Sequence, residues 1–160
     1  MKEILQKIYS HSPQKAVNDI LKSYEKNGFV VSNFIYFSII KVQKLFESGK
    51  KTSRQKEYKK AIMKWDFLLP DGIALQTFYN LANRQFSLSS QKLFNLNGTD
   101  FLPLFLDEIK KRYGWHKICL FLYWAKPDIV GETKQALEYK WFNVVYMQDG
   151  FSELDRKKIP

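Results

Sequence analysis

The stretch that decides the fold is Asp66-Phe67-Leu68-Leu69-Pro70-Asp71-Gly72-Ile73-Ala74-Leu75. Its apolar part has the length of a buried strand, and we expect Pro70 to end that strand because proline donates no hydrogen bond to a sheet. From Ile73 onward apolar residues recur at helical spacing, so Asp71 falls between a strand and a helix. The carboxyl end of a strand is where open α/β sheets build their ligand sites.

Asp71 has two interpretations at this position. An ionised carboxylate is favoured at a helix N-terminus because the first amide groups lack partners and the helix dipole is positive there. Asp71 is therefore either a helix cap or a functional carboxylate. The spacing alone does not separate the two.

A second stretch of the same kind follows about twenty-five residues later: Asn95-Leu96-Asn97-Gly98-Thr99-Asp100-Phe101. Small polar residues again precede a helical pattern, which we expect to run from about Thr99 to Tyr113. The turn at Asn97-Gly98-Thr99 is suited to present backbone amides to a phosphate group.

The order of apolar segments predicts an α/β fold, with an open, largely parallel sheet flanked by helices in a Rossmann-like arrangement. The 160 residues lack a low-complexity linker or an internal repeat, so we expect one domain over residues 1–160. The segment Phe29 to Phe37 is either a strand that runs into a polar turn at Ser32-Asn33 or one longer strand. The other expected elements are an N-terminal helical region broken near Ser12-Pro13 and stopped at Gly28, helices at Ile39 to Phe46, Gly72 to Arg84 and Asp128 to Lys140, and strands at Asp66 to Leu69, Lys117 to Tyr123 and Phe142 to Met147.

This order of motifs resembles the WecG/TagA/CpsF glycosyltransferase family. The resemblance runs from about Gly28 to Glu153 and is carried best by Leu69-Pro70-Asp71-Gly72 and Asn97-Gly98-Thr99-Asp100, with Asp149-Gly150-Phe151 ending the last strand. The resemblance implies transfer of an N-acetylmannosamine-type or related sugar. The donor would be a UDP-sugar, and the acceptor a polyprenyl-diphosphate-linked glycan in cell-surface polysaccharide synthesis.

By this resemblance Asp71 matches the proposed catalytic base of the family. Ser32 and Asn33 fall near its threonine and asparagine on the preceding strand end, and Asn95 stands where the family carries an arginine three residues before the glycine. The implied substrate-binding residues are Ser32, Asn33, Gly72, Asn95, Asn97, Gly98, Thr99 and Asp100.

The chemistry suits a single aspartate. In an inverting transfer, a carboxylate takes the proton of the acceptor hydroxyl as that hydroxyl attacks the anomeric carbon. The chain has no Asp-x-Asp motif, and its carboxylates do not cluster at metal-ligand spacing, so we predict metal independence and no cofactor. The single cysteine, Cys119, lies in an apolar strand pattern and is expected to be a buried core thiol.

The net charge of +10 is concentrated between Lys41 and Lys64, where nine basic residues face two acidic ones. This segment is either a solvated basic surface or a binding surface for anionic lipid headgroups or diphosphates. Binding to nucleic acid is supported by charge alone, and we predict no nucleic-acid partner. The sequence has no 18-residue apolar run and no signal-peptide pattern, so we expect a cytoplasmic protein, peripheral at the inner face of the membrane. The expected membrane-surface residues are Lys50, Lys51, Lys59 and Lys60.

One alternative function stays open. The family's second half is expected beyond Pro160, which motivates a non-catalytic fragment or paralogue that binds a sugar nucleotide, a lipid headgroup or a partner protein. A doubly wound sheet that ends after its fourth strand is also expected to expose an apolar patch near Phe142 to Met147. We therefore expect self-association, as a homo-oligomer, or a partner chain.

Overall fold

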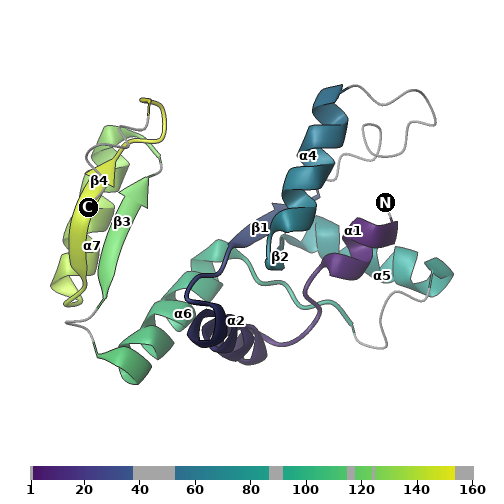
Figure 1. The fold of residues 1–160 in the computed structure, drawn as a ribbon, viewed down its shortest axis with the longest axis horizontal. Coiled ribbons are helices and arrows are strands. Elements are labelled where there is room, and N and C mark those ends of the chain that lie inside the picture. The colour runs from purple at the N-terminus through teal and green to yellow at the C-terminus, as the bar shows by residue number, and fades with distance from the viewer. Residues whose placement is uncertain (1, 38–52, 87–91, 115–117, 124, 154–160) are drawn as a thin grey trace. The chain divides into compact units, whose positions relative to one another are not determined.

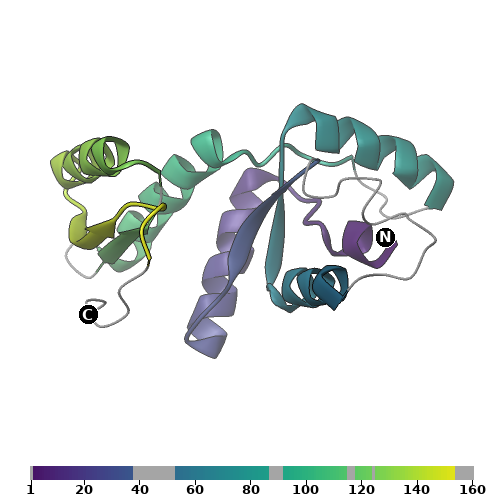
Figure 2. The same cartoon turned by 90° about the horizontal axis from the view of Figure 1, so that it is seen from above.

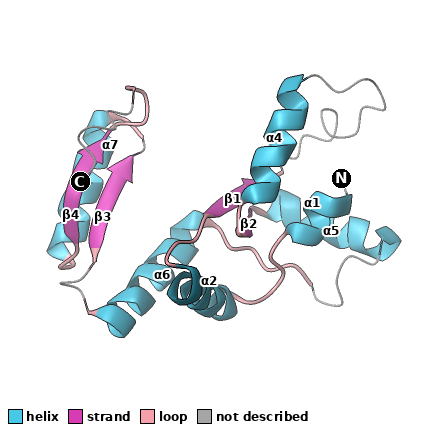
Figure 3. Cartoon of the chain, viewed as in Figure 1, coloured by secondary structure: helices cyan, strands magenta, loops and turns pink. Residues whose placement is uncertain are grey.

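The computed structural model describes residues 2–37, 53–86, 92–114, 118–123 and 125–153. The chain divides into two compact units, Met1–Phe105 and Leu106–Pro160 (Figure 1). Each contains a pair of parallel strands with helices, as the cyan and magenta elements of Figure 3 show. The predicted α/β class with parallel strands flanked by helices is confirmed, and the single domain over residues 1–160 stays a prediction.

The N-terminal region consists of two helices, α1 (Lys2–Lys7) and α2 (Pro13–Asn27), broken at Ser12 and Pro13 as expected. Ser12 caps α2 by accepting a hydrogen bond from the Lys15 amide at 3.4 Å, and Pro13 occupies the first turn, where its missing N–H costs nothing. Gly28 ends the helix in the left-handed conformation, with φ of 78°. Local sequence therefore sets both ends of α2.

The first sheet pairs β1 (Ser32–Tyr36) with β2 (Phe67–Asp71) in parallel. The prediction that Pro70 ends the strand is wrong: Pro70 lies inside β2, opposite Ile35. The Pro70 carbonyl accepts a hydrogen bond from the Leu96 amide at 2.7 Å, on the edge of β2 away from β1. Within a strand the nitrogen and carbonyl of one residue face the same edge, so the proline nitrogen also faces away from β1, where no ladder hydrogen bond is required.

Helices cover both faces of this strand pair. On one face Ile35 and Leu68 join a buried cluster with residues of α1, α4 (Ser53–Lys64) and α5 (Ile73–Phe86). On the other face the Phe34 ring meets Phe101 of α6 (Gly98–Tyr113), with ring centroids 6.1 Å apart. Figure 2 shows α2 on the opposite side of the strands from α4. Alternate residues of each strand thus pack into the apolar layers on opposite faces of the sheet, as expected for a sheet covered on both faces.

The second unit contains the remainder of α6 and a strand–helix–strand arrangement of β3 (Cys119–Tyr123), α7 (Pro127–Tyr139) and β4 (Asn143–Gln148). The two strands pair in parallel, with a register shift between Leu120 and Phe121. Val130 and Val144 are buried, and their packing is consistent with the contacts between α7 and β4. These bounds agree with the expected helix and strands to within one or two residues.

The exposure of β3 and β4 corrects one expectation and bears on another. Cys119 is exposed, not a buried core thiol, because burial alternates along β3 and Cys119 lies on its more exposed side. In the expected patch, Phe142 and Val144 are buried while Val145 and Met147 are 40% and 42% exposed. Self-association stays a prediction. The expected helix at Ile39 to Phe46 lies outside the described residues.

Candidate active site

Asp71 is the last residue of β2 and lies opposite Tyr36, the last residue of β1. Its side chain is half-buried, and among the described residues no hydrogen bond or ion pair holds the carboxylate. The helix that follows, α5, starts at Ile73, and the Gly72 carbonyl accepts its first helical hydrogen bond from the Gln76 amide at 3.2 Å. The cap position of α5 is therefore Gly72, and the Asp71 carboxylate stays available at the strand end.

The backbone after Asp71 turns sharply. Gly72 has φ of +91°, a conformation that residues with a side chain rarely adopt. Its amide donates to Asn95 Oδ1 at 2.8 Å, across 23 residues of sequence. Asn95, expected to bind substrate, thus commits its side-chain oxygen to holding the Asp71–Gly72 turn, while its side-chain NH₂ has no partner among the described residues.

The segment that contains Asn95 runs along α5. Leu93 accepts a hydrogen bond from Gln76 Nε2 at 2.6 Å and donates one to Asn80 Oδ1 at 3.4 Å, and Leu96 donates to Pro70. The segment from Leu93 to Asn95 therefore runs antiparallel to α5, with Leu93 beside the middle of the helix and Asn95 beside its start. The sequence analysis missed Gln76 and Asn80, although Gln76, Asn80 and Arg84 recur every fourth residue and so mark one polar stripe of α5.

The N-terminus of α6 is capped by Asn97. Its Oδ1 accepts from the Asp100 amide at 2.9 Å, and its Nδ2 donates to Asp100 Oδ2 at 2.8 Å. These two hydrogen bonds engage the side chains of Asn97 and Asp100, both of which were expected to bind substrate. The backbone amides of Gly98 and Thr99 have no partner among the described residues, so they remain available to an anion.

Gly98 brings this helix start onto the first sheet. A Cβ added at Gly98 would lie 3.7 Å from the Phe34 ring, which is ordinary contact. Phe34 pairs with Leu69, two residues before Asp71 in β2. The start of α6 therefore lies over the sheet close to the carboxyl end of β2.

Ser32 and Asn33 lie at the other end of the sheet. They begin β1 and pair with Phe67 and Leu68, which come four and three residues before Asp71, or about 13 and 10 Å along a strand. The structure has neither a turn at Ser32-Asn33 nor a strand over the whole of Phe29 to Phe37: the strand starts at Ser32 and ends at Tyr36, so the Ser32 and Asn33 side chains do not reach the Asp71 turn. Of the expected site residues, the candidate site comprises those near the carboxyl end of β2: Asp71, Gly72, Asn95 and the amides of Gly98 and Thr99.

The expected basic surface is only partly described, because Lys50 and Lys51 lie outside the described residues. Lys59 forms an ion pair with Glu3 of α1 at 2.5 Å, which ties α4 to α1. Lys60 is exposed, and with Lys56 and Lys64 it forms a stripe at every fourth position of α4. Among the described residues, none of these three ammonium groups has a hydrogen-bond or ion-pair partner.

Two cavities lie near the segment that precedes α6. One, of about 350 Å³, is lined by Gln76, Thr77, Asn80, Leu81, Arg84 and Lys92. The other, of about 390 Å³, is lined by His11, Ser12, Lys15, Lys92 and Phe94. Lys92 lines both, and Asp71 lines neither.

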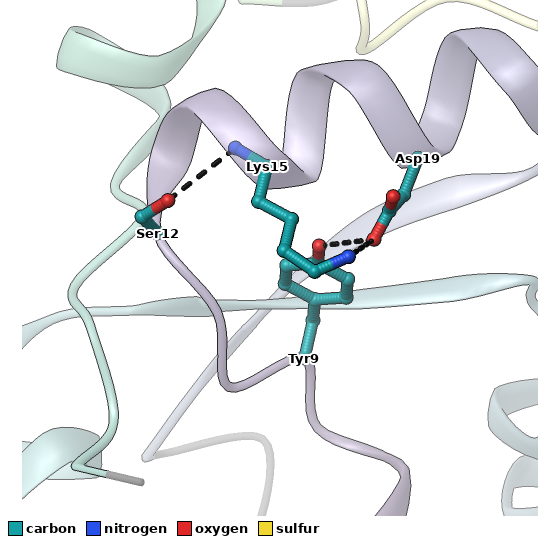
Figure 4. Close-up of polar contacts among 4 residues, drawn as sticks. All are labelled: Tyr9, Ser12, Lys15 and Asp19. Atoms are coloured by element: carbon teal, nitrogen blue, oxygen red, sulfur yellow. Dashed lines mark hydrogen bonds and ion pairs between the residues drawn. The ribbon is translucent and has the colours of Figure 1, made fainter.

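A polar cluster lies beside the second cavity (Figure 4). Tyr9 donates to Asp19 Oδ2 at 2.6 Å, and Lys15 donates to the same oxygen at 2.8 Å. Burial raises the pKa of Tyr9 far above its usual value, and the hydrogen bond to Asp19 adds to this rise. Partial burial alone would raise the pKa of Asp19, but the hydrogen bonds from Lys15 and Tyr9 outweigh it and lower that pKa. The cluster joins Tyr9, near the start of the α1–α2 connection, to Lys15 and Asp19 of α2, and no local sequence pattern indicated it.

The carboxyl end of β4 carries Asp149, the aspartate of the Asp149-Gly150-Phe151 motif. Its side chain accepts hydrogen bonds from the amides of Phe151 and Ser152 and from the Ser152 hydroxyl, at 2.7 to 3.0 Å. These bonds, the Ser152 hydroxyl first, lower the pKa of Asp149. Asp149 therefore stabilises its own turn.

Among the described residues, three or more His, Cys, Asp or Glu side chains nowhere gather closely enough to hold a metal ion. Within the same residues, no helix combines the length and apolar character needed to cross a bilayer. Metal independence remains a prediction.

Comparison with models of protein families gives a match over nearly the whole chain. The model of the glycosyl transferase WecG/TagA/CpsF family matches residues 4–159, nearly the whole chain. No curated protein matches this sequence.

Proposed function

The chain belongs to the WecG/TagA/CpsF family of glycosyltransferases, and from this membership we propose that it transfers an N-acetylmannosamine-type or related sugar from a UDP-sugar. The proposed acceptor is a polyprenyl-diphosphate-linked glycan in cell-surface polysaccharide synthesis. Family membership supports the class of reaction, and the donor and acceptor are the proposed part.

The observation that carries the proposal is the Asp71 carboxylate. It lies at the carboxyl end of a parallel strand, half-buried, and has no partner among the described residues, while the turn behind it is held by Asn95. A carboxylate used only as a cap would accept a hydrogen bond from the first turn of its helix. An unengaged carboxylate at a strand end is instead suited to accept a proton from a substrate hydroxyl.

In the proposed step the acceptor oxygen attacks the anomeric carbon of the donor and forms the new glycosidic bond. The bond from that carbon to the diphosphate oxygen breaks, and the electron pair leaves with UDP. Asp71 takes the proton of the attacking hydroxyl. Because attack comes from the face opposite the leaving group, the configuration at the anomeric carbon inverts.

The leaving diphosphate develops negative charge, which the start of α6 is suited to stabilise. The amides of Gly98 and Thr99 are unpaired among the described residues, and the positive end of the helix dipole adds to their effect. These groups would serve without a divalent metal.

The acceptor is lipid-linked, so we further propose that the protein works at an anionic membrane surface on the cytoplasmic side. The support is the unpaired lysine stripe of α4, Lys56, Lys60 and Lys64. Each basic residue near an anionic bilayer contributes about 1 kcal/mol, enough for reversible association. Lys59 is bound to Glu3 and contributes less than the sequence suggested.

The test is Asp71→Asn, which preserves shape and removes the base. We expect sugar transfer to a lipid-linked acceptor to fall by at least about 100-fold, with UDP-sugar affinity nearly unchanged. The matched control is Asp107→Asn on the exposed surface of α6, which should retain full activity. Near-normal turnover of the Asp71 variant would contradict the assignment of Asp71 as the base.

A further inference from the structure

The cavity along α5 has no role in the reaction step described above. It lies between α5 and the segment that begins at Lys92, and its volume is about 350 Å³. The hydrogen bonds of Leu93 to Gln76 and Asn80 hold that segment against the helix. The cavity is therefore a groove with one wall on α5 and the other at Lys92.

The groove is aligned with the Asp71 turn. Its lining residues on α5 run from Gln76 to Arg84, and Gln76 is one helical turn after Gly72. Asn95, in the chain that continues from Lys92, is bonded to Gly72 at the start of the same helix. One end of the groove thus lies next to the Asp71–Gly72 turn and the other end lies at Arg84 and Lys92.

The middle of the groove offers groups that bind sugar hydroxyls. Gln76 uses its Nε2 and Asn80 its Oδ1 to hold Leu93, which leaves Gln76 Oε1 as an acceptor and Asn80 Nδ2 as a donor. Leu81 lines the same groove and is 60% exposed, an apolar surface for a sugar ring or an alkyl chain. A few polar groups beside an apolar side chain are typical of small-molecule sites.

The far end of the groove is cationic. Arg84 and Lys92 are both exposed, and neither has a hydrogen-bond or ion-pair partner among the described residues. Within the part of the chain that the structure describes, no acidic residue lines the groove. Because helical side chains lean toward the N-terminus of their helix, Arg84 reaches back over the turn of Asn80, roughly 12 Å along the helix from Gly72.

We propose that this groove binds a glycosyl diphosphate, with its phosphates at Arg84 and Lys92 and its sugar toward Gln76 and the Asp71 turn. Arginine and lysine are the side chains that bind phosphate oxygens best, arginine through two parallel hydrogen bonds. The span between the cations and the turn suits a diphosphate followed by one sugar ring. The class of ligand rests on the proposed function, in which the lipid-linked acceptor is a glycosyl diphosphate that attacks through a sugar hydroxyl, while the diphosphate of the donor is bound at the start of α6.

Binding is measured by isothermal titration calorimetry on the full chain, without turnover. The probes are inorganic pyrophosphate, UDP and an N-acetylglucosaminyl diphosphate with a short prenyl chain. The test variant is Arg84→Gln combined with Lys92→Gln. The control is Lys22→Gln combined with Lys26→Gln on α2, which removes the same charge at exposed positions outside the groove.

We expect the groove variant to bind the prenyl probe at least tenfold more weakly, because two charge-assisted contacts to its phosphates are lost. The α2 control should bind this probe like the unmodified chain. Loss of affinity for the prenyl probe with UDP binding retained assigns the groove to the acceptor. Arg84→Lys keeps the charge but not the two parallel hydrogen bonds, so its affinity should lie between those of the unmodified chain and the groove variant, which guards against a folding defect.

Three results would overturn the proposal: no binding of the prenyl probe by the unmodified chain, equal binding of that probe by the groove variant and the α2 control, or a loss of affinity in the groove variant that is confined to UDP. Failure of the proposed function gives a different pattern, in which the probes bind through Arg84 and Lys92 but no sugar is transferred. Asp71→Asn should leave the affinity for pyrophosphate unchanged.

Discussion

Asn95 provides the sharpest structural prediction, because its side chain holds the turn behind Asp71 through one hydrogen bond. The Gly72 amide donates to Asn95 Oδ1 at 2.8 Å in a partly buried environment. Asn95→Ala removes the acceptor and leaves that amide without a partner. Leaving a donor unsatisfied costs about 1 to 3 kcal/mol, so the turn should open more often.

The measurement is amide hydrogen exchange of Gly72 by NMR under native conditions. An opening free energy lowered by about 1 to 3 kcal/mol corresponds to exchange roughly 5 to 150 times faster. Asn95→Asp keeps an oxygen acceptor at the same position and should preserve most of the protection. Asn80→Ala is the matched control, because it removes a bond to Leu93 and should leave Gly72 unaffected.

The same variant tests the link between the turn and the reaction. If Asn95 positions the turn, Asn95→Ala should reduce kcat in step with the loss of Gly72 protection. Unchanged exchange at Gly72 in Asn95→Ala would refute the reasoning, because the hydrogen bond would then contribute nothing to the turn.

Three further predictions follow from single features. Gly72→Ala should destabilise the protein by about 1 to 3 kcal/mol in urea unfolding, because φ is +91° at this position, even though the new Cβ would meet nothing within 4 Å. Gly131→Ala is the control inside α7, where the new Cβ also has no close neighbour. It should be neutral or stabilise the protein by up to about 1 kcal/mol. In Tyr9→Phe, the pKa of Asp19, which burial raises and the bonds from Lys15 and Tyr9 lower, should increase in an NMR titration. Because the pKa of Asp19 is lower in the folded than in the unfolded state, Asp19 stabilises the fold at pH values above its unfolded-state pKa. This stabilisation disappears as the pH falls through the folded-state pKa of Asp19. Tyr9→Phe should therefore lose it at a higher pH than the unmodified chain. Charge reversal of the α4 stripe, in which Lys56, Lys60 and Lys64 become Glu, should abolish co-sedimentation with anionic vesicles. High salt should have the same effect, because it screens surface charges beyond about 3 Å at 1 M. Equal sedimentation with neutral vesicles would contradict an electrostatic attachment.

Local pattern in the sequence determined the elements. The Ser12-Pro13 break, the stop at Gly28 and the helices after Gly72 and Gly98 were all predictable, because caps, proline and glycine act on their own backbone and helical spacing is visible within one segment. The position of Asp71 at a strand end was predictable for the same reason. The α/β class followed from the alternation of these elements.

Strand register and long-range hydrogen bonds were decided only by the tertiary structure. Ser32 pairs with Phe67 and Tyr36 with Asp71, so Ser32 and Asn33 lie far from the Asp71 turn, and nothing within either strand reports its register with the other. Pro70 remains in its strand because its nitrogen faces the edge away from β1, which depends on where the partner strand lies. The Asn95–Gly72 bond spans 23 residues and the Lys59–Glu3 pair 56. Sequence periodicity shows which face of its own helix or strand a side chain occupies. The residue that this side chain contacts depends on how distant segments of the chain pack together. That packing decides which of the expected residues form the site.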